Sequence, residues 1–386
     1  TDGFKDIRGT VTDVGPSAGN SGFTRIEPMI KLAWTPNSAI PQRIEFKHGY
    51  SETDADETYL GLSRADFNAN PHQRYSATQF DNIETSQQRT HLRYYVSPSV
   101  DTDLVATAYN NEFERNWFKI FGVNDGSGNV SLGRALADPA LSNALAVLRG
   151  EAAGTLRYRN NNREYYSRGA EITLNQRYNL GEVRNTLRAG VRMHRDESSR
   201  FQNDVAFAQD ANGTITGSTV GAPGSQDNRF QRAEALAVFA ENTFDFGRLT
   251  VTPGVRFERV DWTTFNRNSG VSAEGDASFT TGGVGFNFTL SDTTRLFGGL
   301  YQGFSPPAPG DGISGADEEK SLSLELGARH RSGAGLTQEL VLFGTRFDNL
   351  IVSDNFGASG SGAGDTEAVG KVDTYGVEYA LRYDLG

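Results

Sequence analysis

Arginine is the residue type in this sequence with the clearest chemical potential. The 386 residues include 31 arginines but only 6 lysines. A planar guanidinium donates paired hydrogen bonds to a carboxylate, so an arginine-rich set suits recognition of carboxylate-bearing ligands. For each arginine, the alternative is an internal salt bridge with the many Asp and Glu residues. Seven stand in or beside the long connections between predicted strands and are our candidate ligand-binding residues: Arg64, Arg74, Arg157, Arg159, Arg163, Arg195 and Arg200.

Other chemistries have weaker support. The acidic stretch "SETDADET" (51–58) offers oxygen ligands for Ca²⁺, but a solvated acidic loop is the more common reason for such a run. The five histidines are scattered without a metal-ligand spacing, and the chain has no cysteine. No nucleophile motif accompanies the serines, histidines and aspartates. We therefore expect no enzyme activity, no protein-bound metal and no cofactor.

The segments that must position the arginines are β-strands with two different faces. In "EKSLSLELGARHRSG" (319–333), Leu322, Leu324 and Leu326 alternate with Ser323 and Glu325. Successive side chains of a strand point to opposite faces, so one face is apolar and the other polar. A soluble sandwich would bury the leucines, whereas a membrane barrel would turn them toward lipid. The same alternation recurs in "TLRAGVRMHR" (186–195), "VTPGVRFE" (251–258) and "GVEYALRYD" (376–384).

We predict thirteen strands and one helix. The helix follows Asp138 and Pro139, has an apolar stripe of leucines and stops at Gly150. The strands are expected near 23–34, 42–53, 89–97, 103–118, 164–178, 186–197, 231–244, 248–262, 277–290, 294–304, 320–331, 336–352 and 371–384.

The connections between these strands alternate between short and long. The long ones cover roughly 54–88, 119–163, 198–230, 263–276, 305–319 and 353–370. Short turns at one end and long loops at the other are typical of outer-membrane barrels, whereas a sandwich gives no reason for such sorting. We therefore expect a membrane barrel. Its lipid-facing positions should include Leu322, Leu324, Leu326, Val377, Tyr379 and Leu381, and its lumen-facing positions Glu325, Arg329, Glu378 and Arg382.

The amino-acid composition agrees with a membrane barrel. No stretch approaches the ~18 consecutive apolar residues of a transmembrane helix. The net charge of −11 argues against a nucleic-acid partner. Bacterial single-chain barrels use an even number of strands, so thirteen strands predict a partial barrel whose edge strands, near 23–34 and 371–384, lack neighbours.

Several segments resemble TonB-dependent outer-membrane receptors, most closely the ferric dicitrate transporter-like branch. The resemblance covers nearly the whole chain and is weakest in 121–163 and 198–230. It rests on "DGFKD" (2–6), "DADETYLGLSRADFNANPHQRYSATQFDNI" (54–83), "ATAYNNEFERNWFKI" (106–120), "YQGFSPPAPGDG" (301–312), "EKSLSLELGARHR" (319–331), "FDNLIVSDN" (347–355) and "VGKVDTYGVEYALRYDLG" (369–386).

The resemblance implies a 22-stranded, antiparallel, up-and-down transmembrane β-barrel filled by an N-terminal plug that engages TonB. We expect residues 1–386 to be part of this all-β barrel, without the plug and without the first and last strands, and unable to transport alone. The implied role is uptake of a ferric chelate such as ferric citrate across the bacterial outer membrane, with iron as cargo. TonB, outer-membrane lipid and lipopolysaccharide are the implied partners. A passive porin, an outer-membrane adhesin or enzyme, and a soluble β protein remain alternatives.

Overall fold

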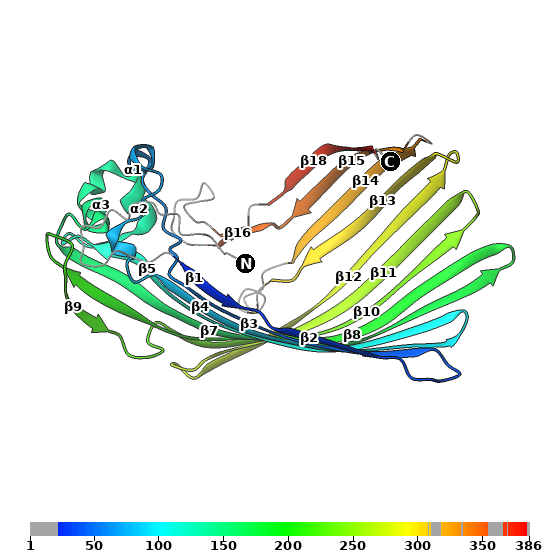
Figure 1. The fold of residues 1–386 in the computed structure, drawn as a ribbon, viewed down its shortest axis with the longest axis horizontal. Helices are drawn as coiled ribbons and strands as arrows, with labels where there is room; N and C mark the ends of the chain where they lie inside the picture. The colour runs from blue at the N-terminus through cyan, green and yellow to red at the C-terminus, as the bar shows by residue number, and fades with distance from the viewer. Residues whose placement is uncertain are drawn as a thin grey trace.

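The fold is one large antiparallel sheet that curves into a trough (Figure 1). The computed structural model describes residues 22–307, 309, 318–332, 335–353, 366–368 and 370–383. Within these residues the sheet has 16 strands, of which thirteen follow one another in chain order and three pair beside that path. The thirteen predicted strands and their up-and-down order are therefore confirmed. The segment "DGFKD" lies outside the described residues.

The bounds of the elements are as follows. The path consists of β1 (Phe23–Ile26), β3 (Gln42–Ala55), β4 (Asn82–Ser99), β5 (Thr102–Asn124), β7 (Gly154–Leu180), β8 (Val183–Gln209), β10 (Asp227–Asp245), β11 (Leu249–Asn266), β12 (Val271–Thr289), β13 (Thr294–Ser305), β14 (Glu319–Arg331), β15 (Leu336–Asp348) and β18 (Val372–Tyr383). Beside it lie β2 (Met29–Trp34), β6 (Asn129–Ser131) and β9 (Ile215–Val220). A separate hairpin pairs β16 (Ile351–Ser353) with β17 (Thr366–Ala368). The helices are α1 (Arg64–Ala69), η1 (Ser76–Thr78), α2 (Leu132–Ala137), η2 (Pro139–Leu141) and α3 (Ser142–Arg149).

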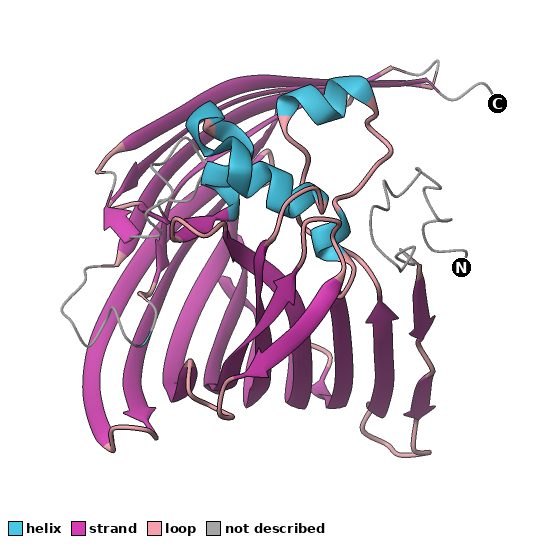
Figure 2. Ribbon diagram, turned by 90° about the vertical axis from the view of Figure 1, so that its left-hand side faces the viewer, coloured by secondary structure: helices cyan, strands magenta, loops and turns pink. Residues whose placement is uncertain are grey.

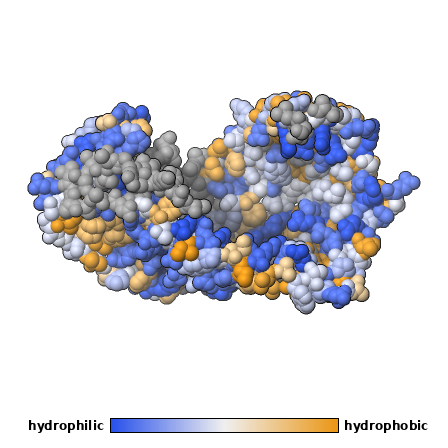
Figure 3. Space-filling view, viewed as in Figure 1, coloured by the Kyte–Doolittle hydropathy of each residue, from blue (hydrophilic) through white to orange (hydrophobic). Residues whose placement is uncertain are grey.

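The two faces of the sheet carry the predicted residue types. Leu322, Leu324 and Leu326 are between 47% and 49% exposed on the outer, convex face, and Ser323 between them is buried. Leu326 is level with Leu342 of β15 and Val377 of β18, whereas Leu322 is level with the ion pair of Arg346 and Asp373, where the apolar band ends. Glu325 lines a hollow on the inner, concave face. In Figure 3, hydrophobic patches lie along the lower edge of the molecule.

The strands extend much further than the apolar alternation predicts. We expected β4 to begin near residue 89 and β7 near 164, but they begin at Asn82 and Gly154. β7 and β8 each have 27 residues, whereas ~9–11 residues suffice to cross a membrane. The predicted bounds were wrong: the extension of β4 is mostly polar on both faces, whereas the extensions of β7 and β8 keep an apolar face, with Leu156, Tyr158 and Val205 buried in a cluster. Much of the 198–230 and 263–276 connections is therefore strand.

The helices lie together at one end of the sheet (Figures 1 and 2). Asp138 accepts a hydrogen bond from the amide of Ala140, α3 follows, and Gly150 ends α3 with φ +80°, as the predicted helix required. Helix α3 packs on fully buried Tyr158 and Leu156 of β7 to form an apolar cluster with the 56–81 connection. Of the helices in the described ranges, none has the length and apolar character needed to span a bilayer.

Within the described residues, the sheet is not closed. Strands β1 and β2 pair only with β3, and β18 pairs only with β15. The predicted open edges are thus confirmed, and the inner wall of the trough is the concave surface available for a site.

Candidate functional site

Four arginines form a row across the inner face of the sheet. The register places Arg115 of β5 opposite Arg163 of β7, Arg163 opposite Arg200 of β8, and Arg200 opposite Arg229 of β10. Alternation along each strand puts all four on the face that also carries Glu171 and Arg192. Like charges directly opposite each other destabilise a sheet. A row of four therefore calls for an explanation in terms of what it binds.

One carboxylate, that of Asp227, neutralises part of the charge of this row. Asp227 lies 3.4 Å from Nη1 of Arg200 and 3.0 Å from Nη2 of Arg229, and its side chain is only 16% exposed. The Nε atoms of both arginines are buried without a hydrogen-bond partner. Asp227 therefore neutralises one end of the row and leaves donors unused even there.

The other end of the row has no such counter-ion. Arg163 donates from Nε to Asn161 Oδ1 at 2.8 Å and from Nη1 to the Tyr165 hydroxyl at 3.3 Å, which are neutral acceptors. Arg115 lies over the Trp117 ring at 5.8 Å, and its Nε is buried without a partner. In the part of the chain that the structure describes, neither guanidinium forms an ion pair with a carboxylate. Two adjacent, half-buried guanidinium groups thus face the interior without an anion.

Lys119 adds a cation beside the row. Its ammonium lies 4.1 Å from the centre of the Tyr59 ring and 4.2 Å from that of Trp117. Tyr59 also donates a hydrogen bond to the carbonyl of Ile120, which joins the 56–81 connection to β5. Buried Asp81 accepts hydrogen bonds from Thr58 Oγ1 at 2.5 Å and from the Ile120 amide at 2.8 Å. The connection therefore holds the upper margin of the site in place.

Below the row, the inner wall is hollowed, and the residues that line the hollow are mostly uncharged, with Asp196 beside His194 as the acidic residue of the inner face there. A space of about 380 Å³ is lined by Asn111, Phe113, Tyr165 and Gln231, among others. The rings of Phe113 and Tyr165 stack with centroids 5.8 Å apart. Amide and aromatic groups at this position can contact the uncharged body of a ligand whose acidic groups reach the arginines.

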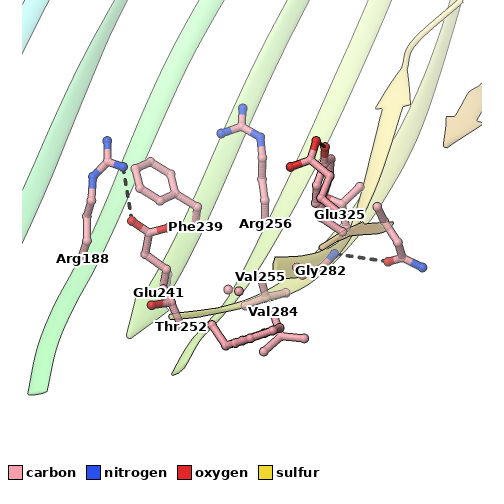
Figure 4. Close-up of a pocket in the computed structure, with 18 of the residues that line it drawn as sticks. Arg188, Phe239, Glu241, Thr252, Val255, Arg256, Gly282, Val284 and Glu325 are labelled. Atoms are coloured by element: carbon pink, nitrogen blue, oxygen red, sulfur yellow. Dashed lines mark hydrogen bonds and ion pairs between the residues drawn. The ribbon is translucent and has the colours of Figure 1, made fainter. Parts of the chain in front are cut away.

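A larger hollow of about 820 Å³ lies further along the inner wall, on β7 to β14 (Figure 4). Its arginines are already matched: Arg188 contacts Glu241 at 3.3 Å, and Arg256 contacts Glu258. Glycines 254, 283 and 285 leave part of this wall without side chains. Both of its arginines have a carboxylate partner and further glutamates line it, so the arginine row is the stronger candidate for binding an anion.

The seven arginines predicted from the sequence separate into different environments. Arg163 and Arg200 belong to the row. Arg159 is held by Asp204 through contacts of 2.7 and 3.2 Å, and Arg157 lies over the Phe121 ring at 4.6 Å. The prediction that Arg157, Arg159 and Arg163 lie in a loop was wrong, because all three are on β7.

The remaining three candidates lie away from the row. Arg195 is on the opposite, outer face and pairs with Glu197 and Glu234. Arg74 donates to the Thr78 side chain and carbonyl and to the Asp56 carbonyl, so it supports the turn of η1. Burial lowers the pKa of Arg74, and Asp81 opposes this. Arg64 is the exposed first residue of α1.

Sequence reasoning missed Arg115, Arg229, Trp117 and Lys119. A signal existed for β5, because Tyr109, Asn111, Phe113, Arg115, Trp117 and Lys119 fall at every second position. Nothing in the sequence indicates that Arg115 and Arg229 stand at the same level, since that depends on strand register.

Comparison with known proteins shows which family and which solved structures share this architecture. Residues 31–386 match the family described as TonB dependent receptor-like, beta-barrel. Among solved structures, the ferric citrate transporter FecA in its unliganded form superposes with a TM-score of 0.66 at 18% identity, over 95% of this chain and 54% of that one. The ferric-catecholate import receptor Fiu from E. coli K12 gives a TM-score of 0.69 at 12% identity, over 94% and 56%. The siderophore receptor PiuA from Acinetobacter baumannii gives 0.70 at 11% identity, over 96% and 56%.

These identities establish a shared fold, and the chain spans about half the length of the structures that it matches. The family match covers most of the sequence and agrees with the order of the thirteen strands. The chain belongs to the TonB-dependent receptor family, as part of its β-barrel domain.

Proposed function

We propose that this chain is part of an outer-membrane transporter that takes up an anionic ferric chelate, with ferric citrate as the first candidate cargo. The observation that carries the proposal is the pair Arg115 and Arg163, two neighbouring inner-wall guanidinium groups that have no carboxylate partner among the residues that the structure describes. Iron in such a complex is already coordinated by its chelator. The protein therefore needs cations and hydrogen-bond donors for the chelator's carboxylates, which arginine provides.

The family match and the similar solved structures support the proposal that the cargo is a ferric chelate. The matched solved structures include proteins described as a ferric citrate transporter, a ferric-catecholate import receptor and a siderophore receptor. We further propose that energy reaches the transporter through TonB and a plug encoded with this barrel. The iron is cargo, and no resident metal or cofactor is part of the proposal.

The test is titration of the purified full-length receptor with ferric citrate. Each charge-assisted hydrogen bond contributes ~1.5–3 kcal/mol, about ten- to a hundredfold in affinity. Changing both Arg115→Gln and Arg163→Gln should weaken binding by at least about tenfold. Arg256→Gln is the matched control, because Arg256 is on the same face but already contacts Glu258; its affinity should stay within about twofold of wild type.

The outcomes separate the parts of the proposal. Unchanged affinity in the double variant would reject the arginine row as the site. Absence of binding by the wild-type receptor would remove ferric citrate as cargo and leave the family assignment standing. Uptake by cells that lack TonB would favour the passive porin.

A further inference from the structure

The hollow below the arginine row continues the site along the inner wall. Two levels of the sheet line it: the first holds Gln87, Phe113, Tyr165, Ser198 and Gln231, and the second holds Asn111, Ser167, Asp196 and Ala233. On β5 these levels lie two and four residues from the row, which corresponds to ~7 and ~14 Å along a strand. A ligand whose acidic end reaches the arginines can therefore extend into the hollow.

Asp196 is the carboxylate that the inner face presents to this hollow, and the neighbouring histidine does not cancel its charge. Arg192 donates two hydrogen bonds to the Tyr109 hydroxyl, at 3.1 and 2.9 Å. The hydroxyl is left to donate its own proton to Nδ1 of His194, 2.5 Å away. The imidazole proton is thus assigned to Nε2, which donates to Asp196 at 2.8 Å. A neutral His194 therefore orients Asp196 and leaves it negative.

This carboxylate can accept further hydrogen bonds from a ligand. The Asp196 side chain is 55% exposed, and it accepts hydrogen bonds from His194 and Ser167. Its two oxygens offer about four lone-pair positions, so acceptor capacity remains. Glu197 also borders the space, but alternation puts its side chain on the outer face, where it pairs with Arg195. Asp196 is therefore the acceptor that an occupant of the hollow meets.

The other groups of the hollow suit hydroxyl groups and a carbon chain. Asn111 Oδ1 is buried without a hydrogen-bond partner. Across the described ranges, the side-chain amides of Gln87 and Gln231 form no hydrogen bond. The stacked rings of Phe113 and Tyr165 supply an apolar surface beside them. A hydroxyl both donates and accepts, whereas a carboxylate brings acceptors only. The hollow therefore favours a hydroxylated group over a second carboxylate.

We propose that the hollow binds the hydroxylated body of the chelator, so that the cargo is the ferric complex of a polyhydroxy carboxylate. The carboxylate end contacts Arg115 and Arg163. Hydroxyl groups farther along the chelator donate to Asp196 and Asn111, and its carbon chain lies against Phe113. The volume of about 380 Å³ falls within the range of ~300–1,000 Å³ for small-molecule sites. The inference rests on the proposed uptake of an anionic ferric chelate and narrows the class of chelator.

The experiment titrates the purified full-length receptor with ferric gluconate and ferric lactate. Both chelators carry a hydroxyl next to the carboxylate, and only gluconate adds a chain of further hydroxyl groups. We expect the wild type to bind the gluconate complex at least about tenfold more tightly. Asp196→Asn should reduce this preference at least about fivefold, because a hydroxyl binds more weakly to a neutral acceptor and the lactate complex does not reach the residue.

Glu241→Gln is the matched control. Glu241 is an inner-face carboxylate that contacts Arg188 and lies outside the hollow. Its substitution should leave the preference for gluconate within about twofold of the wild-type value. Gln231→Leu tests the hollow without altering the hydrogen bonds that orient Asp196, and it should lower the preference in the same direction as Asp196→Asn.

Equal affinity of the wild type for the two complexes, or an unchanged preference in both Asp196→Asn and Gln231→Leu, would overturn the inference. Arg115→Gln/Arg163→Gln should weaken both complexes equally, because they share the carboxylate end. Binding of ferric citrate that depends on these two arginines, together with no preference for gluconate, would reject the polyhydroxy cargo and leave the proposed function standing. The two proposals can therefore fail separately.

Discussion

Arg159 and Arg163 are four residues apart on the same face of β7, yet their environments give them different roles. Arg159 forms a bidentate ion pair with Asp204, which neutralises its charge. Within the described ranges, Arg163 donates only to an amide oxygen and a hydroxyl. A guanidinium that is already neutralised gains little from a ligand carboxylate, whereas an unneutralised one gains a charge-assisted hydrogen bond. Local pairing, more than arginine content, therefore decides which residues can recognise an anion.

Asp81 gives a prediction for the pH dependence of the adjoining connection. Burial raises the pKa of Asp81 to about 6 from 3.8, although hydrogen bonds from Thr58 and the Ile120 amide oppose the shift. The folded state therefore holds its proton to higher pH than the unfolded connection does. Stability of this region should fall as pH rises from about 4 to about 6, by on the order of 2–3 kcal/mol, and then level off.

Hydrogen exchange at the Ile120 amide, corrected for its intrinsic pH dependence, measures this effect directly. Asp81→Asn should remove the pH dependence between about 4 and 6. Protection that increases with pH across this window in the wild type would contradict the sign of the shift.

At the scale of the strands, inner-face glycines are paired with phenylalanines. Gly190 is opposite Phe239, Gly327 is opposite Phe297, and Gly376 is opposite Phe343. In each pair a Cβ on the glycine would collide with the ring, with the nearest ring atom at 2.6 Å for Gly190 and Gly376. The rings lie across the glycines and cover backbone that would otherwise be bare.

Gly327→Ala should destabilise the barrel, because the Phe297 ring must leave its place over β14. The expected loss is about 1–3 kcal/mol in the free energy of unfolding of the full-length receptor in micelles. Gly285→Ala is the control, since its nearest neighbour would be the Gly298 carbonyl at 3.8 Å. Equal effects of the two substitutions would show that the ring contact contributes nothing.

At the scale of the whole molecule, the sheet separates two solvents. The exposed leucines of β14 and the exposed apolar residues of β15 and β18 form the band on one face, and paired charges such as Arg329 with Glu339 lie on the other. The outer face is thus suited to lipid and the inner face to water or a polar ligand.

Leu324→Arg should therefore cost about 2–4 kcal/mol in the free energy of folding into lipid vesicles, the value for a cation near the middle of the bilayer. Glu325→Arg, one position along the strand but on the inner face, should cost much less. If both substitutions cost a similar free energy of folding, the outer face would not contact lipid and the inner face water, as the apolar band implies.

The sequence by itself determined the thirteen-strand path, the two faces and the capped helix, because these depend on local rules. Period-two alternation places Leu324 and Glu325 on opposite faces, and Asp138 and Gly150 bound their helix through contacts with near neighbours. The same alternation separates Arg195 from Arg200, which are an odd number of positions apart. Only the tertiary structure decided the site, because strand register brings Arg115, Arg163, Arg200 and Arg229 to one level. Register is set by packing over the whole sheet and by the bulge near Gly122. For that reason no local pattern could show which arginines would be left without a carboxylate.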